Sequence, residues 1–345
     1  MTTLMSTTLE ELKFHDKVDQ EGLHLVSIPE IVKDDRKLNV TAADLTVSEP
    51  ITIEKIKEKV AIYGGAIVRN FIAEEDCDQM LADLRPYIDA QGVTDDLQNF
   101  LPPTTARVGR TVLKSKTIAE KFLAHPTNLA VANEFLGREN AFRIGPDQIV
   151  TGTSEAQLNS CMAFAVRPGA EDQPLHRDDV IHHNIRRKME TYEFGTETAI
   201  GTVLALKRTT KENGATRFIP GSHLWDHYRE PSDENAFYAE LEKGDAFFML
   251  ASCYHGGSAN ITKDEERVII ILFMTQGTLR QEEMVLLGAD LDYLRSLSVE
   301  ALKAMGLQLS QPFCGHVDNI DAIEYLLPES DYRRPHFKES YKVTA

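Results

Sequence analysis

Hydrophobic and polar positions in the first part of the chain follow helical spacing. One amphipathic helix is predicted over residues 51–63 and another over residues 74–88, each with an apolar stripe along one side. Residues 66–71 lie between them and read as a short strand. Two shorter helices fit residues 117–124 and 127–136. This part of the chain is therefore expected to be mainly helical.

Further along, the pattern changes to short apolar runs that are typical of β-strands. These runs are rich in Val, Ile, Phe and Thr, and turn residues such as Gly, Pro, Asn and Asp separate them. They occupy residues 157–167, 198–207, 216–219, 245–250 and 266–276. Helical spacing returns over residues 281–306. The sequence predicts a mainly β protein with a helical surround.

The N-terminal residues 1–50 are polar and mixed, and a weak alternation at 23–28 predicts one edge strand. We therefore expect an N-terminal extension over residues 1–50, followed by a single domain over residues 51–345. The parts of this domain are expected in the order helical residues 51–139, a β core over about 140–278 and a helical region over 281–345.

The overall charge limits the classes of partner. The 345 residues include 37 Lys and Arg against 54 Asp and Glu, which gives a formal net charge of −17. Phosphate-rich surfaces attract basic proteins, so the charge argues against nucleic acids and anionic membranes as partners. A well-solvated acidic surface is expected instead.

Cysteine usage and the N-terminus point to the cytoplasm. Cys77, Cys161, Cys253 and Cys314 are widely spaced and form neither a zinc knuckle nor a disulfide framework. The first residues lack a basic segment followed by an apolar one, so no signal peptide is expected. No apolar run approaches the roughly 18 residues that a membrane-spanning helix needs.

The residues with the clearest chemistry are His176, Asp178 and His255. On a strand, residues two positions apart share one face, so His176 and Asp178 are expected to reach the same metal ion. His255 lies 77 residues after Asp178, which leaves room for several intervening strands of one barrel. Two histidines and one carboxylate form the facial ligand set of non-haem Fe(II) oxygenases. We expect these three residues to bind the metal.

Arg267 follows His255 by 12 residues and begins an apolar run. Strand alternation places Arg267 on the same face as Ile269, Ile271 and Phe273. A guanidinium on an apolar inward face needs an anion, and it can bind a carboxylate with two parallel hydrogen bonds. Arg267 is therefore expected to bind a carboxylate co-substrate, and the alternative is an internal ion pair with an acid such as Asp245.

Five ordered motifs extend this pattern beyond the metal ligands. They are QPLHRDD at 173–179, ENGAT at 212–216, PGSHLW at 220–225, KGDA at 243–246 and the segment from His255 to Arg267. With these motifs, residues of about 140–278 resemble the phytanoyl-CoA dioxygenase family of Fe(II)/2-oxoglutarate-dependent oxygenases. The similarity is strongest to the fungal branch that modifies secondary metabolites, and residues 1–50 exceed the usual N-terminus of that branch.

The resemblance implies a fold, a cofactor and two co-substrates. The fold is a double-stranded β-helix, also called a jelly-roll or cupin-like barrel. Fe(II) is held by His176, Asp178 and His255, and the co-substrates are 2-oxoglutarate and O2. The resemblance places the far carboxylate of 2-oxoglutarate on Arg267, with Gln173 as a weaker candidate for the same co-substrate.

The same resemblance indicates the reaction. Halogenating relatives replace the acidic ligand with a small residue, whereas Asp178 is present here. We therefore expect oxidation of an unactivated C–H bond of a hydrophobic small molecule. Hydroxylation, desaturation, epoxidation, endoperoxide formation and rearrangement all use the same ligands, so the ligand set does not choose among these outcomes. A homodimer is suggested only by the resemblance to this family.

Substrate contacts are less clear from the sequence. The loops 95–112 and 180–197 are the segments suspected of lining the substrate site, the first with Arg107 and Arg110. His182 and His183 are interpreted as loop residues beside the site. Three further residues are interpreted as structural. His223 is expected to form hydrogen bonds, Trp225 to pack in the core, and Tyr254 to point away from the metal.

Three other functions remain as alternatives. One is a fatty acyl-CoA hydroxylase of the same family, which calls for a basic patch and often a peroxisomal signal, neither of which is evident. Another is a catalytically silent barrel that binds a ligand or a partner subunit. The last is a zinc or manganese cupin enzyme, in which Arg267 has no obvious role.

Overall fold

The computed structural model describes residues 13–20, 23–27, 32–34, 39–91 and 104–343 of the chain. Its core is a six-stranded antiparallel sheet in the order β4-β13-β9-β15-β8-β5. These strands span Gly65–Val68 (β4), Thr105–Val108 (β5), Ala156–Val166 (β8), Ala199–Ala205 (β9), Ala246–Leu250 (β13) and Arg267–Gln276 (β15). The longest pairing, β15 with β8, runs from Arg267 opposite Val166 to Gln276 opposite Ala156.

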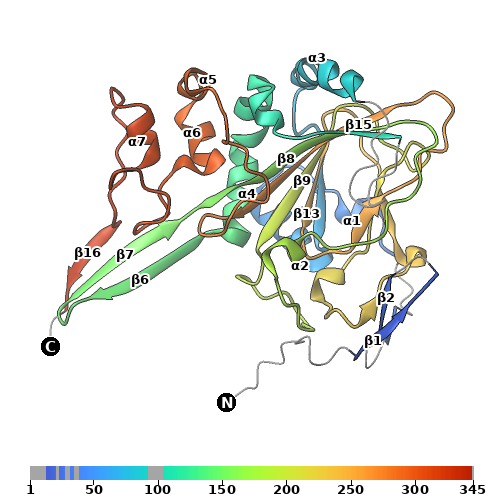
Figure 1. Ribbon diagram of the computed structural model, residues 1–345, viewed down its shortest axis with the longest axis horizontal. Coiled ribbons are helices and arrows are strands. Elements are labelled where there is room, and N and C mark those ends of the chain that lie inside the picture. The colour runs from blue at the N-terminus through green and yellow to red at the C-terminus, as the bar shows by residue number, and fades with distance from the viewer. Residues whose placement is uncertain (1–12, 21–22, 28–31, 35–38, 92–103, 344–345) are drawn as a thin grey trace.

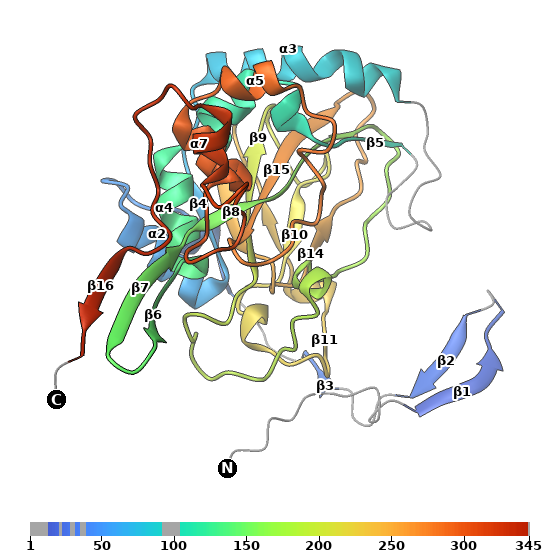
Figure 2. The same ribbon diagram turned by 60° about the vertical axis from the view of Figure 1, so that its left-hand side comes forward.

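A smaller sheet faces the large one. It has the order β12-β10-β14, and its strands are Thr216–Phe218 (β10), Phe237–Ala239 (β12) and His255–Gly257 (β14). Both pairings in it are antiparallel. Figure 2 shows β10 and β14 in front of β9 and β15. The two sheets enclose a barrel of the jelly-roll type, so the predicted double-stranded β-helix is confirmed.

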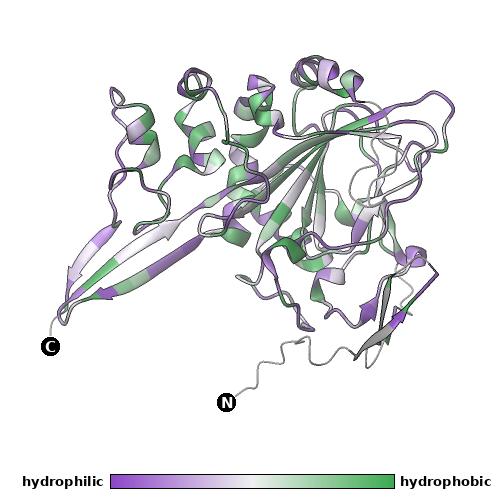
Figure 3. Cartoon of the chain, in the orientation of Figure 1, coloured by the Kyte–Doolittle hydropathy of each residue, from purple (hydrophilic) through white to green (hydrophobic). Residues whose placement is uncertain are grey.

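Helices cover the outer side of the large sheet (Figure 1). The helices near it span Ala42–Leu45 (α1), Ile53–Tyr63 (α2), Glu74–Ala90 (α3) and Pro126–Leu136 (α4). The apolar stripes predicted for α2 and α3 are buried, with Ile56, Val60, Met80 and Leu84 each 0% exposed. Figure 3 shows hydrophobic residues gathered where these helices meet the sheet. Burial of these stripes is the main force that holds the helices on the barrel.

The predicted helix over 281–306 is only partly correct. Residues 281–290 form turns, and helical structure is confined to Leu291–Arg295 (α5), Val299–Leu302 (α6) and a π-helical turn at Lys303–Leu307. Val285 lies within the turns and is fully buried. Val285 therefore packs against the rest of the protein from a turn, which has no fixed period. A last short helix spans Ala322–Leu326 (α7).

An additional three-stranded sheet was not expected from the sequence. It consists of Arg138–Ile144 (β6), Gln148–Ser154 (β7) and Glu339–Lys342 (β16), in the order β16-β7-β6. Figure 1 shows it as an arm that projects from the barrel and continues the direction of β8. Most side chains of β6 and all of those of β16 are exposed, so these segments lack the apolar alternation of a half-buried strand.

Short strands of the N-terminal part lie apart from the large sheet. Lys13–Val18 (β1) and His24–Ser27 (β2) pair with each other, so the edge strand predicted at 23–28 exists but forms its own hairpin (Figure 2). Val32–Lys33 (β3) pairs in parallel with Arg229–Glu230 (β11). The division into an extension over 1–50 and one domain over 51–345 stays a prediction.

Candidate metal centre

A pair of backbone hydrogen bonds brings two of the predicted ligands together. The N–H of His176 donates to the carbonyl of His255 at 2.9 Å, and the N–H of His255 donates to the carbonyl of His176 at 2.9 Å. His255 begins β14, while His176 lies in an isolated bridge. The two imidazole rings consequently lie with their centroids 4.5 Å apart.

Asp178 reaches the same point by a different route from the predicted one. It has helical backbone angles, φ −90° and ψ −16°, directly before a 3-10 turn at Asp179–His182. Its N–H donates to the carbonyl of Ala251 at 2.9 Å, which fixes the turn against the end of β13. The expectation that His176 and Asp178 share one face of a strand is therefore wrong. A turn brings the carboxylate to the two imidazoles.

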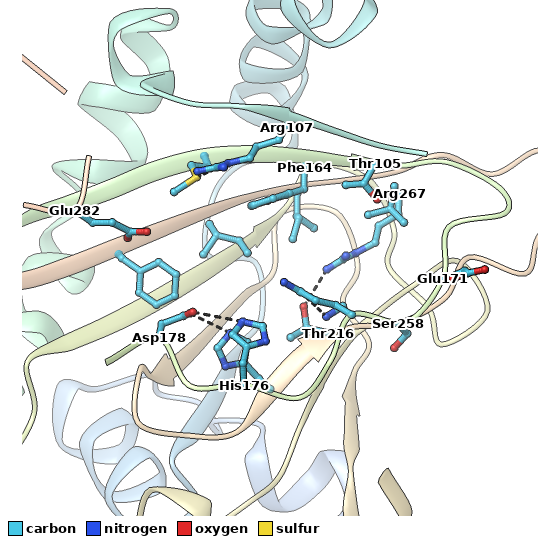
Figure 4. A pocket seen from close by; sticks show the side chains of 18 residues that line it. Thr105, Arg107, Phe164, Glu171, His176, Asp178, Thr216, Ser258, Arg267 and Glu282 are labelled. Carbon is cyan, nitrogen blue, oxygen red and sulfur yellow. Dashed lines mark hydrogen bonds and ion pairs between the residues drawn. The ribbon is translucent and has the colours of Figure 1, made fainter. Parts of the chain in front are cut away.

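The three side chains have the geometry of a metal site. One ligand atom from each lies within 4.8 Å of the others. The carboxylate of Asp178 is 3.1 Å from Nε2 of His255 and 3.4 Å from Nε2 of His176 (Figure 4). Each Nδ1 contacts a backbone carbonyl instead, that of Pro174 at 2.7 Å and that of Cys253 at 3.1 Å. These contacts favour the proton on Nδ1 and leave Nε2 to bind a metal.

The electrostatics of the group match this role. Burial alone would raise the pKa of Asp178, but the charge of His255 and the hydrogen bonds from both histidines hold it well below its ordinary value. Burial likewise opposes the charge on His255, but the Asp178 carboxylate raises the pKa of His255 overall. A metal ligand must be deprotonated, so both imidazoles would hold an ion in their neutral form.

Arg267 lies in the same cavity with an incomplete set of partners. It is 2% exposed, and its Nη2 donates to Oγ1 of Thr216 at 3.0 Å. Its Nε is buried without a hydrogen-bond partner in the described part of the chain. Burial lowers the pKa of Arg267 to about 9, so the group stays charged at neutral pH. A buried cation of this kind is suited to pairing with an anion.

The alternative partner for Arg267 is excluded by the structure. Asp245 forms an ion pair with Arg69 and accepts a hydrogen bond from the N–H of Asn70 at 2.9 Å. The internal ion pair between Arg267 and Asp245 that the sequence left open is therefore absent.

Gln173 is tied to the strand that carries His255. Its side-chain oxygen accepts from the N–H of Gly257 at 3.1 Å, and its own N–H donates to the carbonyl of Gly257 at 3.0 Å. The side chain lines the same cavity as the metal group and Arg267. Gln173 is therefore placed to contact a ligand in this cavity.

The triad and Arg267 line one cavity of about 180 Å³ between the two sheets. Its apolar wall comes from alternate residues of β8 and β15, namely Met162, Phe164, Val166, Ile269, Ile271 and Phe273. The predicted alternation from Arg267 to Phe273 is thus confirmed. Two polar lining residues, Thr105 and Arg107, come from β5 within the suspected loop 95–112, whose residues 95–103 lie outside the described residues.

Other suspected residues lie elsewhere. Arg110 donates to the carbonyl of Leu287 and does not line the cavity. The segment 180–197 contributes no lining residue, and Nε2 of His182 contacts the carbonyl of Arg280 at 3.0 Å. Glu282 lines the cavity but was missed, because residues 281–290 were expected to be helical.

The structural interpretations of three further residues agree with their surroundings. His223 is fully buried, and its Nε2 contacts the carbonyl of Ala61 at 3.0 Å. Trp225 is 7% exposed. Tyr254 is absent from the cavity lining, and its ring lies 4.2 Å from the guanidinium carbon of Arg177.

Comparison with known proteins decides the family. The family model for phytanoyl-CoA dioxygenase (PhyH) matches residues 62–268. The chain belongs to this family. The predicted family and enzyme class, a dioxygenase, are confirmed, and family membership together with the triad supports iron and 2-oxoglutarate as the expected cofactor and co-substrate.

Relatives match most of the chain. It is 36% identical over 314 residues to the uncharacterized protein YJR154W of Saccharomyces cerevisiae, which covers 88% of each chain. It is 36% identical to dioxygenase himG of Aspergillus japonicus, over 78% of this chain and 85% of that one. Dioxygenase peniF of Penicillium patulum is 34% identical, over 81% and 90%.

A solved structure is also similar to this chain. The non-haem α-ketoglutarate-dependent epimerase SnoN from nogalamycin biosynthesis aligns with a TM-score of 0.48 at 18% identity, over 67% of this chain and 86% of that one.

Within the described ranges, no helix is both long enough and apolar enough to cross a membrane.

Proposed function

We propose that this protein is an Fe(II)/2-oxoglutarate-dependent dioxygenase that oxidises an unactivated C–H bond of a hydrophobic small molecule in secondary-metabolite biosynthesis. The observation that carries the proposal is one cavity that holds the triad at its base and the buried, incompletely paired Arg267 beside it. Relatives of similar length that are named dioxygenases support it.

His176, Asp178 and His255 would hold the iron. Two imidazoles and one carboxylate suit Fe(II) and leave coordination positions open for other ligands. When bound, the iron supplies oxidation of the substrate by O2, coupled to conversion of 2-oxoglutarate into succinate and CO2. The protein orients the donors through the two Nδ1 contacts to backbone carbonyls.

Arg267 would bind the far carboxylate of 2-oxoglutarate. Its guanidinium is fixed by Thr216 and keeps donors free toward the cavity. Gln173 lines the same cavity and would contact the same co-substrate. A charge-assisted pair in a water-poor cavity gives both affinity and a defined orientation.

The apolar wall defines where the substrate lies. Phe164, Ile271 and Phe273 line the same cavity as the metal group and would exclude water from it. We propose a cytoplasmic location, which the widely spaced cysteines support. A homodimer stays a prediction.

The proposal is tested by measuring succinate formed from 2-oxoglutarate in air with added Fe(II). We expect slow turnover without substrate in the wild type and none in His176→Ala. The matched control is His316→Ala, because His316 is exposed and outside the cavity. Equal turnover in His176→Ala would reject the metal assignment, and strong stimulation by a fatty acyl-CoA would favour the acyl-CoA alternative.

A further inference from the structure

The cavity has a second polar region away from Arg267. Glu282 and Arg107 line it, and Figure 4 shows Arg267 and Glu282 on opposite sides of the metal group. The roles proposed for iron and 2-oxoglutarate use neither Glu282 nor Arg107. These two side chains therefore remain to contact the substrate.

Glu282 is held firmly through one of its two carboxylate oxygens. Oε2 accepts from Oγ of Ser160 at 2.9 Å and from Nδ2 of Asn159 at 3.4 Å. The N–H of Glu282 donates to Oδ1 of Asn159 at 2.8 Å. Asn159 and Ser160 are each 1% exposed, so they form a rigid support. Oε1 receives no hydrogen bond from the described residues and is free to accept one from a ligand.

Arg107 is held at its backbone and less firmly at its side chain. Its N–H donates to Oε1 of Gln91 at 2.8 Å, and its Nε donates to Sδ of Met162 at 3.1 Å. A thioether is a weak acceptor. The two Nη groups make no hydrogen bond, and the guanidinium no ion pair, with the described part of the chain. Arg107 therefore offers donors to a ligand in the same region as Glu282.

Glu282 and Arg107 carry opposite charges in the same cavity but form no ion pair with each other. Such an arrangement favours one class of ligand over others. A cationic ligand at Glu282 would meet the charge of Arg107, and an anionic ligand at Arg107 would meet that of Glu282. A neutral group with adjacent donor and acceptor atoms satisfies both side chains without either repulsion. An amide is such a group, since it carries an N–H beside a carbonyl.

We propose that Glu282 and Arg107 bind an amide or lactam of the substrate, the N–H on Oε1 of Glu282 and the carbonyl on the guanidinium of Arg107. The apolar part of the substrate then lies along Phe164, Ile271 and Phe273, toward the metal group. This inference rests on the proposed function and narrows its substrate class. It disfavours acyl-CoA thioesters, which lack the N–H at the reacting end.

The test uses three small probes on one bicyclic skeleton: 3,4-dihydroquinolin-2(1H)-one, its N-methyl derivative and the anion 1,2,3,4-tetrahydro-2-naphthoate. Each is titrated into the anaerobic complex with Fe(II) and 2-oxoglutarate, and the shift of its visible charge-transfer band is followed. We expect the N–H lactam to bind at least about tenfold more tightly than the other two, a ratio that corresponds to one good hydrogen bond.

Variants show whether the two side chains cause this preference. Glu282→Leu should remove the preference for the N–H lactam over its N-methyl derivative, and Glu282→Gln, which keeps an acceptor oxygen, should restore part of it. Arg107→Met should weaken both lactams alike. Glu300→Gln is the matched control, because Glu300 is an exposed acid of α6 outside the cavity. All variants should retain the charge-transfer band itself.

The outcomes separate this inference from the proposed function. Absence of the band in the wild type would contradict the proposed function. A normal band with no lactam binding, with the carboxylate bound best, or with the lactam preference unchanged in Glu282→Leu would overturn the amide site alone.

Discussion

At the scale of residues, Arg267 couples stability to ligand binding. Its charge is buried, and a single hydrogen bond that it donates to Thr216 replaces only part of the water that it has lost. A buried charge without an opposite partner destabilises the folded state. The same charge becomes favourable once a carboxylate binds. Its removal should therefore change stability and affinity in opposite directions.

We expect Arg267→Met to weaken 2-oxoglutarate binding by about 2–5 kcal/mol, since a buried charge pair is lost. Without 2-oxoglutarate, the variant should be at least as stable as the wild type in urea. Burial lowers the pKa of Arg267 to about 9 in the folded state, so the free-energy cost of burying its charge is fully present below that pH. The difference in unfolding free energy between the variant and the wild type should therefore be constant from pH 6 to 8. An unchanged affinity would remove Arg267 from the co-substrate site.

His223 gives a prediction about acid stability. Burial, aided by the nearby charges of Arg186 and Arg177, lowers its pKa to about 4. The unfolded chain takes up this proton below about pH 6.5, so stability is lost as the pH falls from there toward 4. The loss from this one group is about 2 kcal/mol at pH 5. In His223→Gln the drop in unfolding free energy between pH 7 and 5 should be smaller by about that amount, and an equal drop would contradict the assignment.

The residues of the metal site could be found from the sequence, but their geometry could not. His176, Asp178 and His255 are recognisable because few ligand sets suit a ferrous oxygenase. The 3-10 turn that follows Asp178 has no apolar period to reveal it. Glu282 was missed because its place in the cavity depends on a turn, held by Asn159.

At the scale of elements, the junction of α2 and β4 sets the position of the outer helix on the sheet. Gly64 ends α2 with a left-handed φ of +83°. A Cβ at this position would lie 2.1 Å from Sγ of Cys253 and 2.8 Å from Nδ1 of His223. Both neighbours are fully buried. Only glycine fits here without strain.

Gly64→Ala should lower the free energy of unfolding by more than the roughly 1–3 kcal/mol that a left-handed alanine alone costs. The control is Gly145→Ala in the β6–β7 turn, where φ is +72° but no atom lies within 4 Å of the added Cβ. The difference between the two variants in urea denaturation measures the steric part. Equal effects would show that the surroundings of Gly64 adapt freely.

Elements with a clear apolar period were predictable, and those without one were not. The runs that became β8, β9, β13 and β15 are buried on both sides, which leaves an apolar signal in the sequence. The arm of β6, β7 and β16 is held mainly by pairing between strands, and backbone hydrogen bonds leave little trace in residue type.

At the scale of the whole molecule, the barrel is held by contacts that do not involve the three proposed metal-binding side chains. The pairing of His176 with His255 is made by backbone hydrogen bonds, and the large sheet buries an extensive core. Two statements about the domains stay predictions from the sequence. One is that residues 1–50 exceed the usual N-terminus of the family, and the other is that residues 51–345 form a single domain.

Removal of metal by a chelator should therefore leave the far-ultraviolet circular dichroism of the protein unchanged. Addition of Fe(II) and 2-oxoglutarate under nitrogen should then raise the Tm, because both bind only the folded state. Loss of secondary structure on chelation would mean that the metal is needed for folding, as in small zinc domains.

The most direct test of the account is an anaerobic titration of the metal-free protein with Fe(II) and 2-oxoglutarate, monitored in the visible range. The account predicts a weak metal-to-ligand charge-transfer band in the wild type, no band in His255→Ala, and a band that needs far more 2-oxoglutarate in Arg267→Met. Binding of Fe(II) to the wild type without any such band would contradict the assignment of 2-oxoglutarate to this cavity.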